Sequence, residues 1–513
     1  MARTVPLLAA SLLALCSVAQ QSTGVLWERT LGGDQWDVGR KLAFTPDGGM
    51  VVAGTSNSVS ATTSAVLGGT DVWVVRLDAY GVPLWHRNFG GSGDELAVHV
   101  EVLDDGRIVV LGSTSSLNGD LGVPLANADH FLLTLDPNGD PLFAQRFSAG
   151  PTGTTDIAQW VRLPDGTYAG VGGKLVYPTA GPVNADVMAL RISPTGTVLW
   201  VQTYGGTGYD SGISIAASGN GKLTAVGITR SNKGDVTDYM GMGDGWLLEI
   251  SPNGDLVSQR TLGGAFSDQL TGVVQTSDGH VVVTGYYSYE MMVFGTIQPA
   301  TRVIIEKLAP NGQSVWRRDY GGAMGDYGWW IRRTPDGGFL LFAHAYSTDG
   351  DVTGFGGTID AWLLRLDEQG ELLWQRTFGG WEQESPGDIQ LTADGGCVLL
   401  MAVSGPNSEM SQYFGDVDSW VVRLGPDGTT GTVALASPRA ALDVTPALGG
   451  YTVHIAPEMG TAQLVVRDVA GRLLHSSTVP PGRHTLPLAA NAGVYLISLQ
   501  AGGRSTTTRI AHQ

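Results

Sequence analysis

The stretch Trp85–Gly91 reads WHRNFGG, and close variants of it recur along most of the chain. Five copies begin with Trp, whereas the copies that begin at Phe143 and Ser258 are degenerate. The copies start at residues 27, 85, 143, 200, 258, 316 and 374, so the step is 58 residues throughout, except for one step of 57. A fixed period of this length is typical of a repeat protein in which every unit has the same structure.

Each unit contains four short segments rich in β-branched, aromatic and apolar residues, which we name strands a, b, c and d. In the first unit they cover residues 37–48, 49–55, 71–77 and 82–89. Turns rich in Asp, Pro and Gly separate a from b and c from d, whereas the connections from b to c and from d to the next a are longer and more variable. Such segments bounded by turn residues predict an antiparallel four-stranded sheet.

Strands b and c are apolar on both faces, which requires a sheet that is covered on both sides. Radial stacking of seven such sheets meets this requirement, so we predict an all-β fold, a seven-bladed β-propeller over residues 24–431. Residues 25–33 form a d strand with no a, b or c before it, and the last unit ends after strand c. The first segment should therefore complete the last blade, as a 3+1 velcro closure, by pairing with the strand around Trp420. An open β-solenoid is the alternative, but it does not require seven equal units.

The first 19 residues have the pattern of an export signal. Arg3 precedes an apolar run over residues 5–19, which is too short for a membrane span, and Ser17-Val18-Ala19 has the small residues of a cleavage site before Gln20. A lipoprotein signal that uses Cys16 is the alternative, although Leu15 stands where such signals have Gly or Ala. Cleavage leaves Cys397 as the single cysteine, so we expect no internal disulfide in the mature chain. Because cleavage also removes the apolar run, we expect no transmembrane span in the mature chain.

The repeat stops after Gly431, and residues 432–513 alternate apolar residues with Gly turns, which predicts a small C-terminal β-sandwich. This segment resembles the type A C-terminal sorting domain of Bacteroidota proteins that leave the cell through the type IX secretion system. The resemblance rests on residues 468–472 (DVAGR), 493–497 (GVYLI) and 508–510 (TRI), whereas Ser437-Pro438-Arg439 departs from the family's Pro-Asn-Pro element. It implies the type IX secretion machinery as a partner and a secreted or outer cell-surface location.

The formal net charge is −18, and the acidic residues are concentrated in the repeats, because residues 432–513 contain six Arg against three Asp and Glu. A body this acidic repels phosphate backbones, which argues against nucleic acid as a partner. It favours solubility outside the cell or the binding of divalent cations such as calcium. Asp349 and Asp351, in the run STDGDVTG, are candidate metal ligands, although the run lacks the ligand spacing of an EF-hand.

The tight a–b and c–d turns leave little room for a site, so the face formed by the d–a and b–c loops is the candidate functional face. The d–a loops carry recurring acids and aromatics that vary from blade to blade. Such acids either bind a ligand at the channel mouth or pin their own loops, and the aromatics either stack on sugar rings or fill gaps between blades. The candidate ligand-binding residues are Trp36, Asp37, Asp94, Tyr209, Asp210, Phe266, Asp268, Asp326, Trp381 and Glu384.

Catalytic motifs are absent from the sequence: there is no HExxH, GxSxG, P-loop or CxxC pattern, and the histidines occupy different positions in their units. We therefore expect a non-enzymatic secreted or cell-surface protein that binds glycans or another extracellular polymer. The alternative is a polysaccharide hydrolase or lyase that uses two carboxylates on the d–a/b–c face. The fifth unit departs from the others, because Arg302 replaces the Asp that opens strand c elsewhere.

Overall fold

The structure is a computed structural model that describes residues 24–58, 67–123, 130–150, 155–176, 184–293, 296–407, 409–426, 442–447, 450–455, 461–468, 472–480, 482–486, 493–501 and 504–512. The leader over residues 1–19 and the segment over residues 427–441 lie outside these ranges. Backbone contacts divide the chain into two compact units, Met1–Thr430 and Gly431–Gln513. None of the described residues is in a helix, and accordingly no helix among them is long and apolar enough to cross a membrane.

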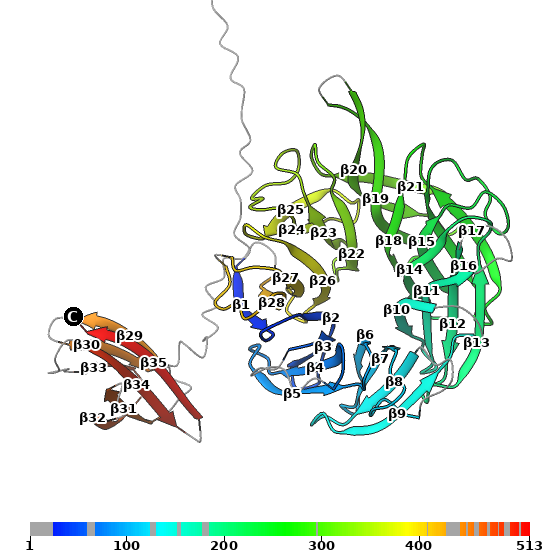
Figure 1. Cartoon of the computed structure of the whole chain (residues 1–513). Helices are drawn as coiled ribbons and strands as arrows, with labels where there is room; N and C mark the ends of the chain where they lie inside the picture. The colour runs from blue at the N-terminus through cyan, green and yellow to red at the C-terminus, as the bar shows by residue number, and fades with distance from the viewer. Residues whose placement is uncertain are drawn as a thin grey trace, which may run out of the picture. The chain divides into compact units, whose positions relative to one another are not determined.

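The first unit is a ring of seven four-stranded antiparallel sheets, which confirms the predicted seven-bladed β-propeller (Figure 1). Blade 1 consists of β2 (Asp37–Phe44), β3 (Met50–Ser56), β4 (Asp71–Leu77) and β5 (Pro83–Phe89). Blade 2 consists of β6 (Glu95–Val102), β7 (Ile108–Thr114), β8 (His130–Leu135) and β9 (Pro141–Phe147). Blade 3 consists of β10 (Thr155–Arg162), β11 (Tyr168–Val176), β12 (Asn184–Ile192) and β13 (Val198–Tyr204). Blade 4 consists of β14 (Asp210–Ala217), β15 (Leu223–Thr229), β16 (Asp244–Ile250) and β17 (Leu256–Leu262). Blade 5 consists of β18 (Gln269–Gln275), β19 (Val281–Val293), β20 (Thr296–Leu308) and β21 (Ser314–Tyr320). Blade 6 consists of β22 (Tyr327–Arg333), β23 (Phe339–Ala345), β24 (Asp360–Leu366) and β25 (Leu372–Phe378).

Blade 7 closes the ring with strands from both ends of the propeller. It contains β26 (Glu384–Leu391), β27 (Cys397–Val403) and β28 (Asp418–Leu424), and its outer strand is β1 (Val25–Leu31). The two strands β1 and β28 pair antiparallel, with Thr30 opposite Trp420. The predicted velcro closure is therefore confirmed, down to the residues that pair.

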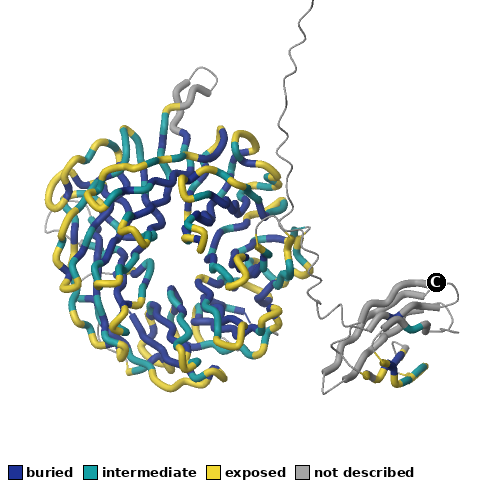
Figure 2. The backbone as a smooth tube through the Cα atoms, turned by 180° about the vertical axis from the view of Figure 1, so that it is seen from behind, coloured by how far each residue is buried: buried dark blue, intermediate teal, exposed yellow. Residues whose placement is uncertain are grey.

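The core lies between blades. Among the described residues, seven clusters of buried apolar side chains each join two neighbouring sheets; for example, Val51 and Val74 of blade 1 pack with Phe131 and Leu133 of blade 2. The tube of Figure 2 shows the buried residues along the strands and the exposed ones mainly in the loops. Burial on both faces explains why strands b and c are apolar without alternation.

The Trp that opens most repeats packs against the next blade. A Cβ on Gly81, in the c–d turn of blade 1, would lie 2.6 Å from Cζ3 of Trp27 in blade 7. Gly81 also has φ 75°, a conformation that favours glycine. One blade along, the indole N–H of Trp85 donates to the Pro137 carbonyl oxygen at 3.1 Å. The repeated Trp and the repeated turn Gly therefore fit together across blade junctions.

The a–b turns are fixed by ion pairs that also recur. The carboxylate of Asp47 lies 2.6 Å from the Arg76 guanidinium of strand c in the same blade. The same pairing recurs in Asp165–Arg191, Asp336–Arg365 and Asp394–Arg423, with Asp278–Lys307 in blade 5. In these five blades the Asp of the a–b turn therefore has a structural partner in strand c.

The second unit contains two antiparallel sheets, as expected for a small β-sandwich. One sheet has the order β29-β30-β33 and the other β32-β31-β34-β35. The strands are β29 (Leu442–Ala447), β30 (Gly450–Ile455), β31 (Ala462–Asp468), β32 (Leu473–Val479), β33 (Gly482–Leu486), β34 (Gly493–Ala501) and β35 (Arg504–His512). Val453, Leu464 and Val466 are buried in this unit.

Candidate functional site

The d–a loops are held rigidly by side chains of their own blade. In the loop that enters blade 2, the N–H groups of five successive residues, 90 to 94, each donate to a side-chain oxygen. The acceptors lie 2.7–3.0 Å away and belong to Asp120, Glu95, Asn118, Ser116 and Ser115. Because every donor of this loop is satisfied within the blade, the loop presents a fixed surface.

The recurring acids of the d–a loops are buried, not displayed. Each accepts the N–H of the residue four positions earlier: Gly33 donates to Asp37 at 2.7 Å, and Gly206 donates to Asp210 at 2.9 Å. Gly264, Gly322 and Gly380 donate in the same way to Asp268, Asp326 and Glu384, all of which are at most 1% exposed. The carboxylates therefore pin their own loops, and direct ligand contact would require these loops to open.

In blade 2 the recurring acid is Glu95 and not Asp94 as predicted, whereas ligand contact by Asp94 stays a prediction. In blade 2 the residue that begins the inner strand is Glu95, which is 1% exposed and accepts the N–H of Gly91 at 3.0 Å. Asp94 lies one residue earlier and is exposed, and it accepts the N–H of Thr70 at 3.0 Å. A count of ten residues from the repeat's first residue would have identified Glu95 in the sequence.

Burial is the main cause of the altered acidity of these groups. It raises the pKa of Asp268 to about 6 and that of Glu384 to about 7, although both accept hydrogen bonds that act in the opposite direction. The pKa of Asp37 is also raised by burial.

The aromatic candidates differ in exposure. Trp381 is 85% exposed and Tyr209 is 45% exposed, whereas Trp36 and Phe266 are half-buried. Other large apolar side chains of the d–a and b–c loops are exposed as well: Leu67, Leu117, Val123, Met240, Met242, Met324 and Phe414. Trp381 and Tyr209 are therefore placed to contact a ligand, and other loops of the same face also expose apolar side chains.

The proposed metal ligands have protein partners in the structure. Asp349 Oδ1 accepts the N–H of Ala323 at 2.7 Å, and Asp351 Oδ2 accepts the N–H of Gly321 at 3.0 Å. Asp351 also accepts a hydrogen bond from the Arg302 guanidinium at 2.7 Å. No group of three or more His, Cys, Asp or Glu in the described part of the chain has the arrangement of a metal site. The STDGDVTG run therefore holds the d–a loop of blade 6 and supplies the partner of Arg302.

The sequence analysis missed a polar cluster on the inner strands. All seven inner strands have a β-bulge at the same place, and the residue after the bulge is chemically different in each blade. These residues are Lys41, His99, Gln159, Ser214, Gly272, Trp330 and Asp388. The sequence carried only a weak signal, because the residue before this position varies as widely, for example Arg40, Thr271 and Gly387.

Three of these residues join blades 6, 7 and 1. Lys41 Nζ lies 3.6 Å from Asp388 Oδ1 and 3.4 Å from the centre of the Trp330 ring. Asp388 is fully buried and also accepts from Arg332 at 2.9 Å and from the Leu42 N–H at 3.2 Å. Burial lowers the pKa of Lys41 to about 8. The cluster links the closing blade to both of its neighbours.

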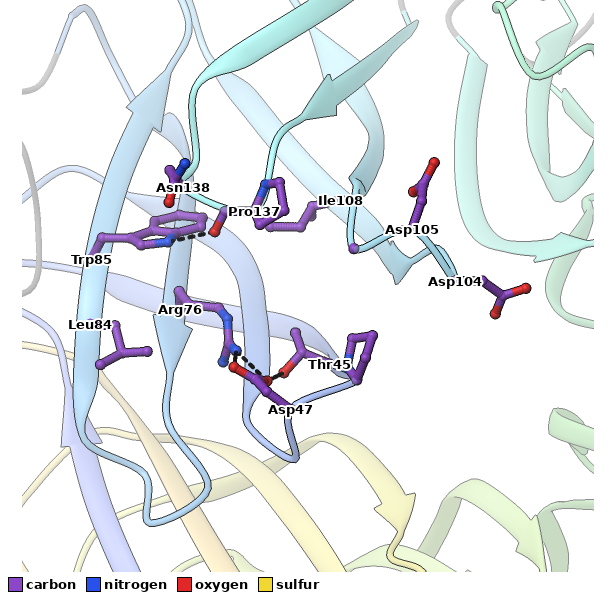
Figure 3. A pocket seen from close by; sticks show the side chains of 12 residues that line it. Thr45, Asp47, Arg76, Leu84, Trp85, Asp104, Asp105, Ile108, Pro137 and Asn138 are labelled. Atoms are coloured by element: carbon purple, nitrogen blue, oxygen red, sulfur yellow. Dashed lines mark hydrogen bonds and ion pairs between the residues drawn. The ribbon is translucent and has the colours of Figure 1, made fainter.

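A pocket of about 570 Å³ lies on the opposite face, between blades 1 and 2 (Figure 3). Its lining includes Asp47, Arg76, Trp85 and Pro137, together with Asp104 and Asp105 of the neighbouring a–b turn. The strongest donors are already used, because Arg76 pairs with Asp47 and the Trp85 indole donates to Pro137. The d–a/b–c face, with its exposed aromatics, remains the better candidate for ligand contact.

Comparison with known proteins adds the following. No family model and no curated protein matches the sequence. Among solved structures, Sqt1 from Chaetomium thermophilum has a TM-score of 0.40 at 10% identity, over 78% of this chain and 100% of that one. Dihydro-heme d1 dehydrogenase NirN has a TM-score of 0.39 at 13% identity, over 76% of this chain and 67% of that one. PorZ, described as a surface component of the type-IX secretion system of Porphyromonas gingivalis, has a TM-score of 0.21 at 10% identity, over 95% of this chain and 86% of that one. At such scores these likenesses do not narrow the function.

Proposed function

We propose that this protein is an exported, non-enzymatic binding protein that holds an extracellular glycan on its d–a/b–c face. The observation that carries the proposal is Trp381, which is 85% exposed in the d–a loop between blades 6 and 7. Water hydrates a bare indole poorly, and the C–H face of a sugar ring is a suitable partner for it. The exposed Glu382 beside it offers a carboxylate to sugar hydroxyls.

The rigidity of the loop supports this role. Glu384 accepts the N–H of Gly380, and the side chain of Asn407 donates to Glu384 at 3.2 Å. Ser404 Oγ accepts the N–H of Gln383 at 3.1 Å. A loop that is already fixed loses little entropy when a ligand binds, so the stacking energy is retained as affinity.

Export is the second part of the proposal. It rests on the leader pattern of residues 1–19 and on the resemblance of residues 432–513 to a type IX sorting domain. In the bacterium that makes the protein, removal of residues 432–513 should leave the propeller inside the outer membrane. Fractionation followed by immunoblotting measures this, and unchanged export of the truncated chain would contradict the assignment.

Binding is tested with the mature chain on a glycan array, followed by titration of the best glycan. Trp381→Ala should weaken binding by about 10- to 30-fold, as expected for loss of a central aromatic contact. Leu373→Ala, which removes an apolar side chain that is 53% exposed on outer strand β25, is the matched control and should bind normally. Equal affinity of the Trp381 variant and the wild type would refute the site. Release of shorter sugars during the titration would favour the hydrolase or lyase alternative.

A further inference from the structure

Two carboxylates from neighbouring blades meet where each d–a loop begins. At the junction of blades 1 and 2, Asp71 is the first residue of β4 and Glu95 is the first residue of β6, and both are at most 1% exposed. A Cβ on Gly90 would clash with both Asp71 Oδ1 and Glu95 Oε2. The two oxygens therefore face the same small space.

One of these oxygens has no donor. Asp71 Oδ2 accepts the N–H of Leu67 at 2.6 Å, and both oxygens of Glu95 accept hydrogen bonds, from Gly91 and Thr114. Asp71 Oδ1 is buried and has no hydrogen-bond partner. A buried carboxylate oxygen beside a second carboxylate is unfavourable unless a positive group lies between them.

The arrangement recurs around the ring. The corresponding oxygens of Asp186, Asp244, Asp360 and Asp418 are also buried without a hydrogen-bond partner. Beside Gly205, a Cβ would lie 2.5 Å from Asp186 Oδ1 and 2.7 Å from Asp210 Oδ2. The corresponding position of blade 2, residue 129, lies outside the described residues. Repetition in five blades shows that the unpartnered oxygen is built into the repeat.

Blade 5 is the informative exception, because Arg302 replaces the Asp. Its guanidinium lies 2.7 Å from Asp351 Oδ2 and 3.1 Å from Asp319 Oδ2. Asp351 accepts the N–H of Gly321 just as Asp120 accepts that of Gly90 at 2.8 Å in blade 2. Neither Asp326 nor Asp351 has a buried oxygen without a hydrogen-bond partner. In blade 5 the chain therefore supplies a positive group at the position where five other blades have the Asp with the unpartnered oxygen.

The charge difference between the two junctions is two. The junction of blades 1 and 2 has Asp71, Glu95 and Asp120, whereas the junction of blades 5 and 6 has Arg302, Asp326 and Asp351. Replacement of Asp by Arg changes the formal charge by +2, which is the charge of a divalent cation. Carboxylate oxygens, without nitrogen or sulfur, are the ligands that Ca²⁺ prefers.

We propose that Ca²⁺ binds between Asp71 and Glu95 beside Gly90, and between Asp186 and Asp210 beside Gly205, where it fastens adjacent blades. Each site supplies two side-chain ligands, so backbone carbonyls and water complete the shell. The exposed Asp120 and Asp235, which accept the N–H groups of Gly90 and Gly205, add negative charge next to the two sites. This role is separate from glycan binding at Trp381.

The test measures bound Ca²⁺ on the mature, chelator-treated full chain by equilibrium dialysis, with Mg²⁺ as the comparison ion. Asp71→Asn, which keeps the shape and removes the charge, should lower the number of bound Ca²⁺ ions by one. Asp326→Asn is the matched control, because it alters a buried loop acid at the junction that already contains Arg302, and it should leave the number unchanged.

Circular dichroism checks that each variant folds. If Asp71→Asn does not fold, Glu95→Gln replaces it as the variant that removes one charge from the site. Ca²⁺ should also raise the melting temperature of the wild type more than Mg²⁺ does. A wild type that binds no Ca²⁺, or an Asp71→Asn variant that binds as many ions as the wild type, would overturn the proposal.

Discussion

Asp388→Asn tests whether the inner-strand cluster holds the ring closed. Asp388 is fully buried in blade 7, and its carboxylate faces two cations, Arg332 of blade 6 at 2.9 Å and Lys41 of blade 1 at 3.6 Å. Asparagine keeps the shape but removes the charge that both cations share. The variant is therefore left with a buried Lys41 ammonium and a half-buried Arg332 guanidinium, with one amide between them.

The magnitude follows from the distances. Two unit charges 3.6 Å apart attract by roughly 4–5 kcal/mol at an effective dielectric constant of about 20. Removal of one partner from a buried pair typically costs about 3–5 kcal/mol, because the other charge stays desolvated. A propeller of roughly 400 residues has an unfolding entropy of about 0.8 kcal/mol per degree, so the melting temperature should fall by about 4–6 °C.

Calorimetry of the mature chain measures this, with the C-terminal unit as a separate transition. The double variant Lys41→Met/Asp388→Asn should be less destabilised than the two single changes predict together, because the uncompensated ammonium is gone. If Asp388→Asn shifts the melting temperature by less than about 1 °C, or if the two changes are additive, the cluster does not carry the closure.

Three further predictions concern the same joint. Gly81→Ala should cost about 2–4 kcal/mol, because it adds strain at φ 75° and a clash with Trp27. Gly48→Ala, at φ 84° and with only an ordinary 3.9 Å contact to the Ala79 Cβ, should cost only about 1 kcal/mol. Equal costs by denaturant unfolding would refute the Trp27 contact. Deletion of residues 20–31 should expose the edge of β28 and produce oligomers in size-exclusion chromatography, and a monomeric, fully stable product would contradict the velcro assignment. Because burial lowers the pKa of Lys41 from 10.5 to about 8, the unfolded chain binds more protons between these values, so stability should rise with pH there. Relative to Lys41→Met, the wild type should gain about 2 kcal/mol between about pH 7.5 and 9.5, and parallel pH profiles would show that Lys41 is not desolvated.

The blades could be predicted from the sequence repeat, because within a blade the strands that pair follow one another along the chain. Residues such as Val51 and Val74 are buried on sheet faces that every unit shares, so their periodicity is visible in a single sequence. The closure was also predictable, since an orphan outer strand at one end matches a missing one at the other.

The candidate site was only partly predictable. The sequence distinguished the variable aromatics of the d–a loops from the repeated Trp residues. Only the structure separated the exposed Trp381 from the half-buried Trp36 and Phe266. For the acids, the sequence left ligand binding and loop pinning open. Burial of Asp37 and Glu384, with N–H donors four residues earlier, favours loop pinning.

By itself, the sequence determined the number of blades, their strand order and the joint, because these depend on local patterning repeated at a constant spacing. The tertiary structure alone decided which polar groups meet. Asp388 accepts from Leu42, a residue 346 positions away, and the Lys41 ammonium lies over Trp330 of a third blade. Such contacts depend on how side chains converge where blades abut, and a period along the chain does not encode the distance between charges on different blades.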